Sequence, residues 1–310
     1  MFDIIGWGAL NVDRLCLVNE FAPCDGETFV NAETKACGGS AANTIIGMAK
    51  LGLNTACIGK IGTDSNGKMM IDYLKSNNVN IDNIIISEGE TGEVIGFVDS
   101  TGDRKLYVTP KVNDKILNNE VNRDFITDTK ILHLTSFVGL NPKDPSVQTQ
   151  MELLEELSGK IKISFDPGML YVNRGKEFMD KLISITDILL INEQELLITT
   201  QKDNLDDAIS EIVDKVEILV IKRSKEGSII KKGDEEYNIG IFNVDTVDTT
   251  GAGDAYNAGF LYGLIKGYTL YESGIIGSYI AAQSTTKSGA TEAIPLINDI
   301  NINEIIQKTY

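Results

Sequence analysis

The sequence predicts an α/β fold: a doubly wound, mostly parallel sheet with helices on both faces, plus a small β-sheet lid. Two observations lead to this fold class. Apolar runs of strand length alternate along the chain with helical segments, which is typical of a parallel sheet covered by helices. Two further segments show the period-two pattern of short strands without helices between them. A length of 310 residues suits one large α/β domain with or without a smaller appendage.

The strands predicted for the large sheet are apolar runs that should be buried. They span residues 2–7, 55–61, 130–134, 161–165, 188–191 and 218–221. The predicted helices lie between or after these strands, at residues 41–51, 67–77, 151–157, 175–184, 205–215 and 255–266. The last helix is apolar nearly all round, so we expect it to be buried with its N-terminus deep in the fold.

The two strand-only segments span residues 13–37 and 92–109. The second alternates in hydropathy from Gly92 to Val98 and then reaches the polar turn Ser100-Thr-Gly-Asp103, which predicts a hairpin. We expect the two segments to form a small sheet that lies over the ligand crevice of the large one. The sequence has no Pro/Gly/Ser-rich linker and no internal repeat, so residues 1–310 are predicted to form a single domain with this lid.

The charge balance excludes several classes of partner. The chain has 28 basic and 45 acidic residues, and its net charge is −17. Such a surface repels nucleic-acid backbones and anionic lipid, so neither nucleic acid nor a membrane is an expected partner. No apolar run approaches the length of a membrane span. An anionic small molecule would have to be held by a metal ion, a helix N-terminus or one or two basic side chains.

Cysteine and histidine carry little functional signal. The four cysteines show no Cys-x-x-Cys pair, which suits reduced thiols in a cytoplasmic protein, and the N-terminus lacks a signal-peptide pattern. The single histidine, His133, lies in an alternating apolar run and is interpreted as a strand residue. Triads and metal sites that depend on histidine therefore have little support.

The run Asp248-Thr-Thr-Gly-Ala-Gly-Asp254 carries the most specific chemistry. Small residues at Gly251, Ala252 and Gly253 allow a sharp turn that exposes N–H groups at a helix start, where anions bind. A carboxylate at Asp254 could remove a proton from a hydroxyl while these N–H groups stabilise a transferred phosphoryl group. The same pattern also fits an ordinary helix cap after a glycine-rich turn.

A second glycine-rich segment, Gly38-Gly-Ser-Ala-Ala-Asn43, opens the helix at 41–51. Paired glycines allow close approach to the backbone, and Asn43 offers both a donor and an acceptor to sugar hydroxyls. A helix start with small residues for close packing would look the same. Asn11 and Asp13 lie on one face of an extended segment and could bind vicinal hydroxyls. The N-terminal glycines lack the third glycine of a dinucleotide-binding site.

The residues Asn192-Glu-Gln-Glu195 follow the strand at 188–191. Polar groups at the carboxyl end of such a strand lie where α/β folds bind ligands, and oxygen ligands suit Mg²⁺, usually through water. A solvated helix start with glutamate in its first turn is the alternative.

Together these segments resemble the ribokinase (PfkB) family of carbohydrate kinases over nearly the whole chain. The segment from Gly38 to Gly52 is similar to the first family signature, and the run 248–254 to the second. The pair Asn192 and Glu195 resembles the family's Asn-x-x-Glu motif for magnesium and phosphate. This resemblance implies a doubly wound domain with a small β-sheet lid.

The resemblance also implies a role for each site residue. Asp254 would be the catalytic base, and the amides of Gly251, Ala252 and Gly253 would form the anion hole. The residues that would contact the acceptor are Asn11, Asp13, Gly39 and Asn43. The residues that would line the ATP and Mg²⁺ site are Asn192, Glu195, Lys222, Ser224 and Gly227. Asp248, Thr250 and the loop 285–290 would surround a monovalent cation such as K⁺ in members that need one.

Several positions depart from ribokinase itself. Thr135 stands where ribokinases have a sugar-binding glutamate, and Ser40 where they have a lysine, so free ribose is in doubt as the acceptor. Lys222-x-Ser224 replaces the usual Thr-x-Gly, and a lysine there could pair with phosphate. The run Ser164-Phe-Asp-Pro-Gly168 resembles archaeal nucleoside and sugar kinases of the family.

The sequence thus predicts ATP-dependent phosphorylation of a sugar-type hydroxyl. A nucleoside kinase that uses the same site is one alternative, and a catalytically silent sugar- or nucleotide-binding regulator is another. A Walker-type kinase is excluded because the chain has no Gly-x4-Gly-Lys-Ser/Thr. The free edge of the lid favours a homodimer formed through the lids.

Overall fold

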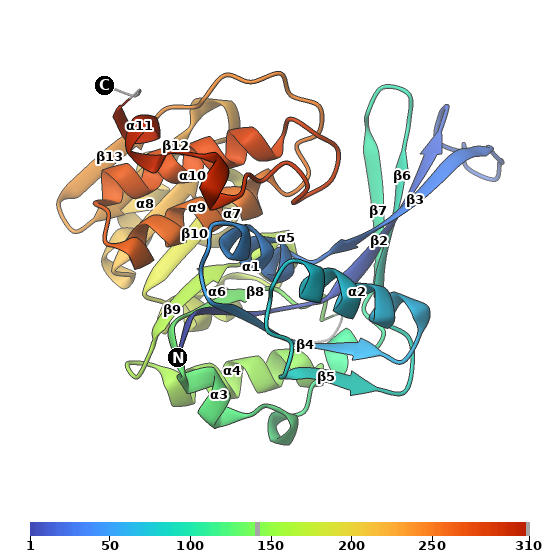
Figure 1. Cartoon of the computed structure of the whole chain (residues 1–310), viewed down its shortest axis with the longest axis horizontal. Coiled ribbons are helices and arrows are strands. Elements are labelled where there is room, and N and C mark those ends of the chain that lie inside the picture. Colours follow the sequence, from blue (N-terminus) through green and yellow to red (C-terminus); the bar gives the residue numbers. More distant parts are fainter. Residues whose placement is uncertain (140–142, 308–310) are drawn as a thin grey trace.

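The computed structural model describes residues 1–139 and 143–307. A nine-stranded sheet runs through the protein in the order β13-β12-β11-β10-β9-β8-β1-β4-β5 (Figure 1). The strands from β11 to β5 are parallel, and β12 and β13 add to one edge in antiparallel fashion. The strands are β1 (Phe2–Trp7), β4 (Thr55–Gly62), β5 (Ile84–Ser87), β8 (Thr129–Thr135), β9 (Lys162–Asp166), β10 (Ile188–Asn192), β11 (Ile218–Lys222), β12 (Ser228–Lys232) and β13 (Glu235–Ile239).

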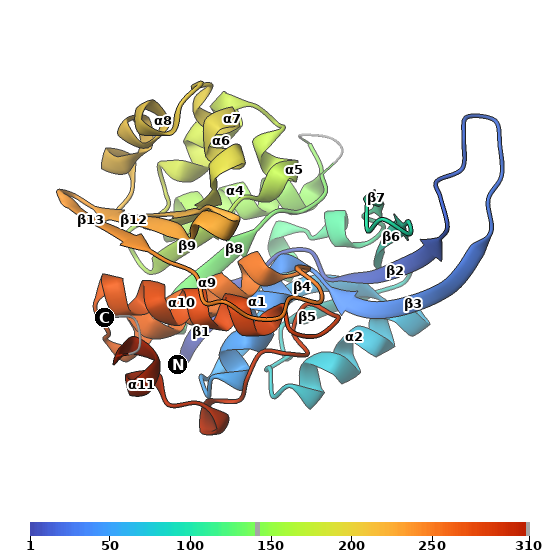
Figure 2. The same ribbon diagram turned by 90° about the horizontal axis from the view of Figure 1, so that it is seen from above.

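Helices cover both faces of this sheet, as Figure 2 shows from above. One face carries α1 (Ser40–Lys50), α2 (Ser65–Ser76), α9 (Ala252–Lys266), α10 (Leu270–Ser284) and α11 (Ile302–Gln307). The other carries α3 (Arg123–Thr127), α4 (Pro145–Leu157), α5 (Gly168–Val172), α6 (Lys176–Ile183), α7 (Glu193–Thr200) and α8 (Leu205–Ile212). The predicted doubly wound, mostly parallel sheet is confirmed.

Alternate residues of the central strands feed two separate cores. In β10, Ile188 and Leu190 pack into the core under α1 and α9, whereas Leu189 and Ile191 pack into the core under α4 to α8. Successive strand side chains point to opposite faces, so a strand covered on both sides must be apolar throughout. This requirement explains why these strands are continuous apolar runs that could be recognised in the sequence.

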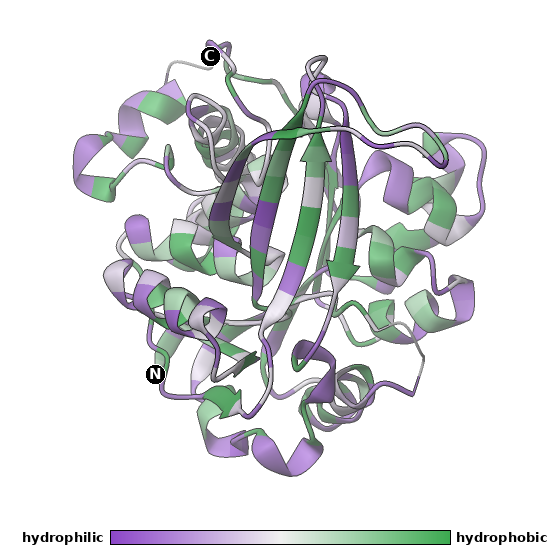
Figure 3. Cartoon of the chain, turned by 90° about the vertical axis from the view of Figure 1, so that its right-hand side faces the viewer, coloured by the Kyte–Doolittle hydropathy of each residue, from purple (hydrophilic) through white to green (hydrophobic). Residues whose placement is uncertain are grey.

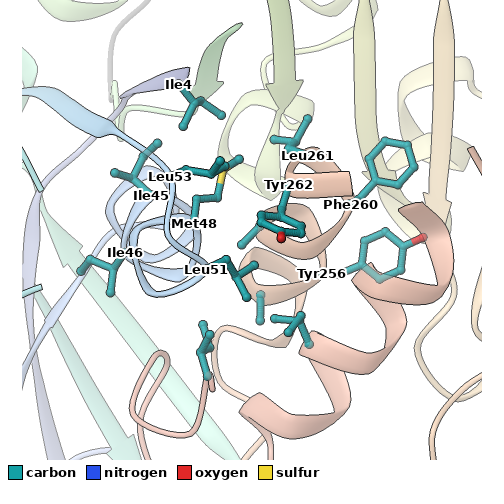
Figure 4. Close-up of a cluster of buried hydrophobic side chains, with 14 of the residues drawn as sticks. Ile4, Ile45, Ile46, Met48, Leu51, Leu53, Tyr256, Phe260, Leu261 and Tyr262 are labelled. Carbon is teal, nitrogen blue, oxygen red and sulfur yellow. The ribbon is translucent and has the colours of Figure 1, made fainter. Parts of the chain in front are cut away.

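Helix α9 lies in the first of these cores, as predicted from its apolar composition. Figure 4 shows Leu261 and Tyr262 on the side of α9 that faces Ile45 and Met48 of α1, all buried. The two helices approach closely at Gly47, where a Cβ atom would lie only 2.8 Å from the Cβ atom of Ala258. Close packing fixes the position of the α9 N-terminus relative to α1, and both helix starts carry predicted site residues.

A separate four-stranded sheet has the order β3-β2-β6-β7 and stands out from the main body (Figures 1 and 3). It consists of β2 (Asn11–Val18), β3 (Val30–Gly38), β6 (Gly92–Val98) and β7 (Arg104–Thr109). These strands come from the two segments predicted to lack helices, and we call this unit the small sheet. The polar turn predicted after Val98 joins β6 to β7, where the Asp99 carboxylate accepts hydrogen bonds from the N–H groups of Thr101 and Asp103.

Some element boundaries differ from the prediction. The helix expected at 151–157 begins already at Pro145, which favours the first helical turn because its ring fixes φ. The antiparallel pair β12–β13 and helix α10 were not predicted. Among the described residues, no helix is both long and apolar enough to span a membrane.

Candidate active site

Polar side chains gather where parallel strands end. Thr135 and Asp166 are register partners at the carboxyl ends of β8 and β9, and Asn192 and Lys222 are partners at the ends of β10 and β11. The strand order reverses between β1 and β8, because β4 and β5 lie to one side and β8 to β11 to the other. Ligands of open α/β sheets bind at such a reversal, outside the carboxyl ends of the strands.

The N-terminus of α9 offers unpaired backbone donors. Gly251 precedes the helix with φ of +73°, and a Cβ atom there would lie 2.6 Å from the Cβ atom of Ala290, so glycine is required. The N–H of Ala252 donates to the Thr249 carbonyl at 3.2 Å. Within residues 1–139 and 143–307, the N–H groups of Gly251 and Gly253 have no acceptor. Unpaired donors at the positive end of a 15-residue helix suit an anion.

Asp254 lies in the first turn of α9 and is joined to the other glycine-rich helix start. Asn43 of α1 donates from Nδ2 to Asp254 Oδ2 over 2.8 Å, although the two residues are 211 positions apart. Burial and the nearby carboxylate of Asp166 raise the pKa of Asp254, Asn43 and Lys222 partly offset this rise, and the resulting pKa is about 7. A carboxylate with a pKa near neutrality is suited to accept a proton.

Lys222 is held at the edge of the anion site. Its Nζ lies 2.6 Å from Asp166 Oδ2 and 3.2 Å from Asn257 Oδ1, and Asn257 Nδ2 donates to the same carboxylate at 2.6 Å. A Cβ atom at Gly253 would meet the Lys222 ammonium at 3.7 Å. Burial alone would lower the pKa of Lys222, but Asp166 and Glu195 raise it above its usual value, so the ammonium stays charged.

Asn192 and Glu195 form a capping box at the start of α7. The Asn192 side chain accepts from the N–H of Glu195 at 2.8 Å, and Glu195 Oε2 accepts from the N–H of Asn192 at 3.1 Å. Glu195 is only 5% exposed, whereas Gln194 in the same helical turn is exposed. Burial raises the pKa of Glu195 to about 7, the charge of Asp166 adds to the shift, and Lys222 opposes it.

The loop after β11 is shaped by two unusual backbone conformations. Ser224 has φ of +52°, and Gly227 has φ of +81°. A Cβ atom at Gly227 would lie 1.9 Å from the Ile239 carbonyl oxygen, so the backbone geometry requires glycine there. Ser224 is exposed.

The predicted acceptor residues lie where the small sheet leaves the large one. Asn11 is buried and its Oδ1 accepts from Asn113 Nδ2 at 2.6 Å. Asp13 is half-buried, and burial raises its pKa to about 6. At Gly39, with φ of +107°, a Cβ atom would lie 2.2 Å from the Ala9 carbonyl oxygen, so this glycine is required by the fold alone.

Asp248 and Thr250 build the turn before the anion site. Asp248 Oδ1 accepts from the Thr250 N–H at 2.9 Å and Oδ2 from the Gly289 N–H at 3.1 Å. The Thr250 hydroxyl accepts a hydrogen bond from Arg104 of β7 at 2.6 Å. Across the described parts of the chain, no group of three or more His, Cys, Asp or Glu side chains is arranged to hold a metal ion. The metal roles of Glu195, Asp248 and Thr250 therefore remain predictions.

Three residues of this site were not predicted from the sequence: Asp166, Asn257 and Arg104. Asp166 could have been found because it ends a buried strand, as Asn192 does. Asn257 follows Asp254 within an apolar helix, where a buried amide needs a partner. His133 is buried in β8 as expected, with Nδ1 3.1 Å from Ser164 Oγ. The four cysteines are free thiols.

Comparisons with known proteins show the family to which the chain belongs. Residues 1–297 match the pfkB family of carbohydrate kinases. An "uncharacterized sugar kinase" of Archaeoglobus fulgidus is 40% identical over 250 residues, which is 81% of this chain and 98% of that protein. A nucleoside kinase of Methanocaldococcus jannaschii is 28% identical over 293 residues, covering 93% of this chain and 92% of that protein.

Solved structures show the same fold. The crystal structure of the M. jannaschii nucleoside kinase, described as an archaeal member of the ribokinase family, superposes with a TM-score of 0.86 at 26% identity over 99% of both chains. A sugar kinase from Pyrococcus horikoshii in complex with ATP has a TM-score of 0.83 at 25% identity, covering 99% of this chain and all of that one. The chain belongs to the pfkB family of carbohydrate kinases, which are ATP-dependent phosphotransferases.

Proposed function

We propose that this enzyme transfers the γ-phosphoryl group of ATP to a hydroxyl of a sugar or a sugar-containing small molecule, with Asp254 as the general base. One observation carries the proposal: the 2.8 Å hydrogen bond from Asn43 to Asp254. It joins the segment predicted to bind the acceptor to the residue predicted to deprotonate it. An acceptor hydroxyl bound beside Asn43 would therefore lie within reach of the base.

The protein residues would divide the chemistry between them. Asp254 would take the proton of the acceptor hydroxyl as the O–P bond forms and the bond to ADP breaks. The free N–H groups of Gly251 and Gly253 would donate to the phosphoryl oxygens, and the Lys222 ammonium would add a positive charge at the same place. These groups are fixed before the reaction, so little reorganisation is needed during it.

The donor set also fits ATP with Mg²⁺. Unpaired amides at a helix start and a largely buried ammonium suit a polyphosphate, and the Glu195 carboxylate lies in the first turn of α7, just after β10. Asn192, Glu195, Lys222, Ser224 and Gly227 would line this side of the site. Bound Mg²⁺ would neutralise charge on the polyphosphate. The cation site at Asp248 and Thr250 is a further part of the proposal, and K⁺ dependence of turnover would test it.

A nucleoside as acceptor is the second candidate, and the apolar side chains of the small sheet support it. The face of the small sheet that carries Asp13 also carries apolar side chains from all its strands: Leu15, Leu17, Ala32, Ala36, Val94, Val98, Leu106 and Val108. A nucleobase could pack against such a face.

ADP release in the presence of a panel of sugars, sugar phosphates and nucleosides tests these proposals together. We expect turnover with at least one unphosphorylated acceptor. Tight binding of a sugar or nucleotide without ADP release from any acceptor would instead favour a silent regulator.

We further propose that the small sheet is a lid over the acceptor and that its edges mediate a homodimer. The sheet order leaves β3 and β7 as edges, and β3 is exposed over most of its length. Unpaired strand edges favour association with another strand. Sedimentation of a monomer at micromolar concentration would contradict the dimer.

A further inference from the structure

Arg104 brings a positive charge from the small sheet to the anion site. It is the first residue of β7, directly after the turn at 99–103, and its Nη1 donates to Thr250 Oγ1 at 2.6 Å. The two residues are 146 positions apart. Thr250 immediately precedes Gly251, so this contact places a guanidinium next to the backbone that would hold the transferred phosphoryl group.

The strand register shows which face of the small sheet Arg104 occupies. Arg104 pairs with Val98 of β6, and Val98 pairs with Leu17 of β2. Directly paired residues share a face, and alternate residues of one strand share a face. Arg104 therefore lies on the same face as Asp13, near the opposite end of the sheet.

Apart from Asn11, Asp13 and Thr34 the other side chains of this face are apolar, and Arg104 is its only cationic side chain among the paired residues of the four described strands. The other cations of the sheet, Arg14, Lys35 and Lys105, lie on the opposite face. The Lys105 ammonium lies 4.3 Å from the centre of the Phe21 ring. Arg104 is thus the exception in a sheet whose other cationic side chains lie on the face away from the anion site.

Arg104 lacks the partner that an arginine in an acidic protein ordinarily finds. Within residues 1–139 and 143–307 no carboxylate oxygen lies within 4.0 Å of Arg104, and its hydrogen-bond partner is the neutral Thr250 hydroxyl. Asp248 is near enough that, although burial raises the pKa of its carboxyl, backbone hydrogen bonds and the charge of Arg104 lower this pKa overall. A guanidinium presents several N–H donors in one plane and matches phosphoryl oxygens better than a hydroxyl does. The position of Arg104 beside the anion site, with a neutral hydroxyl as its hydrogen-bond partner, points to a phosphoryl ligand.

We propose that Arg104 is a catalytic residue: its guanidinium moves from Thr250 onto the oxygens of the transferred phosphoryl group when the small sheet closes. This proposal rests on the kinase function proposed above. Arg104 donates hydrogen bonds and transfers no proton. The acceptor proton goes to Asp254, the new O–P bond forms, and the electron pair of the broken P–O bond leaves with ADP. Closure would thereby complete the site only when the small sheet lies over the acceptor.

Kinetics of Arg104→Ala test the proposal, with Lys105→Ala as the matched control from the same strand and the opposite face. We expect Arg104→Ala to lower kcat at least about 100-fold, by analogy with arginines that stabilise phosphoryl transfer, and to change the KM for ATP less than about threefold. Arg104→Lys should keep part of the activity that Arg104→Ala loses. Added guanidinium ion should restore part of the activity of Arg104→Ala, and Lys105→Ala should have the kcat of wild type.

A binding measurement separates this proposal from the proposed function. By calorimetry, Arg104→Ala should bind ADP as wild type does but lose at least about tenfold in affinity for ADP with Mg²⁺ and aluminium fluoride, a mimic of the transferred phosphoryl group. Wild-type turnover combined with unchanged kcat in Arg104→Ala would overturn the role of Arg104 alone. A raised KM for a phosphorylated acceptor with unchanged kcat would also overturn it, because Arg104 would then bind the acceptor. Absence of ADP release from wild type with every acceptor would overturn the proposed function itself.

Discussion

Asp254 has a raised pKa, although a general base works in its ionised form. Burial and the charge of Asp166 raise its pKa to about 7, so its ionised form is disfavoured in the folded protein. A general base must be ionised to work, and a pKa near the operating pH gives a useful fraction of ionised carboxylate while keeping its basicity. Asn43 holds the carboxylate in place from another helix.

The pH dependence of kcat follows from this shifted pKa. We expect kcat to rise as pH increases through about 7 and to level off above it, because Asp254 acts when deprotonated. Asp166→Asn removes the nearby negative charge and should move the midpoint to lower pH. A profile without a group titrating between pH 6 and 8, in a reaction limited by chemistry, would contradict the role of Asp254.

The same shift predicts a gain in stability when the base is removed. Between the unfolded pKa near 3.8 and the folded pKa near 7, the folded protein binds more protons at Asp254 than the unfolded chain, so stability falls as pH rises through this range. Asp254→Asn should therefore melt at a higher temperature than wild type at pH 8. The difference should vanish near pH 4. A lower melting temperature for the variant at pH 8 would show that the ionised carboxylate stabilises the fold.

Asp13 tests the placement of the acceptor. Asp13→Ala should raise the KM for the acceptor at least about tenfold and leave the KM for ATP nearly unchanged, because a lost charged hydrogen bond weakens binding by about 1.5–3 kcal/mol. Glu33→Ala, which removes an exposed carboxylate from the opposite face of the small sheet, is the control. Equal effects of Asp13→Ala on both substrates would mean that this segment does not contact the acceptor.

At the scale of elements, the sequence predicts most helices and strands of the large sheet, because these depend on local patterns, but not the contacts between them. The burial of α9, the parallel strands and the two helix-free segments could be predicted because each shows its hydropathy pattern within a short stretch of sequence. The hydrogen bond from Asn43 to Asp254 could not be derived this way, because it depends on how α1 and α9 pack. Arg104 was missed for the same reason: only the register of β6 and β7 places it on the face toward Thr250.

The small sheet also leads to a prediction about motion. If it closes over the acceptor, amide hydrogen exchange in residues 92–109 should slow when a substrate acceptor is bound. Exchange should slow most in the edge strand β7, because the amides of its exposed residues are the least protected from exchange in the free protein. Unchanged exchange in these residues on saturation with an accepted substrate would contradict the closure of the small sheet. Helix α8 lies far from the small sheet and serves as the internal reference.

At the scale of the whole molecule, an acidic protein holds an anionic substrate by local means. The net charge of −17 repels a polyphosphate at long range, yet the site concentrates Lys222, Arg104 and the positive end of α9 in one place. The two cores on either face of the large sheet fix Lys222 and the N-terminus of α9 (Figures 2 and 4), whereas Arg104 belongs to the small sheet. Rigid placement lets a few charges act where the overall field opposes binding.

The turnover number of Asp254→Asn compared with wild type tests the central claim most directly. With an acceptor that supports ADP release by wild type, we predict that the variant loses at least about 10²–10⁴-fold in kcat while it binds ATP with unchanged affinity and stays folded. A folded variant that retains most of the wild-type kcat would show that Asp254 is not the base and would contradict the proposed mechanism.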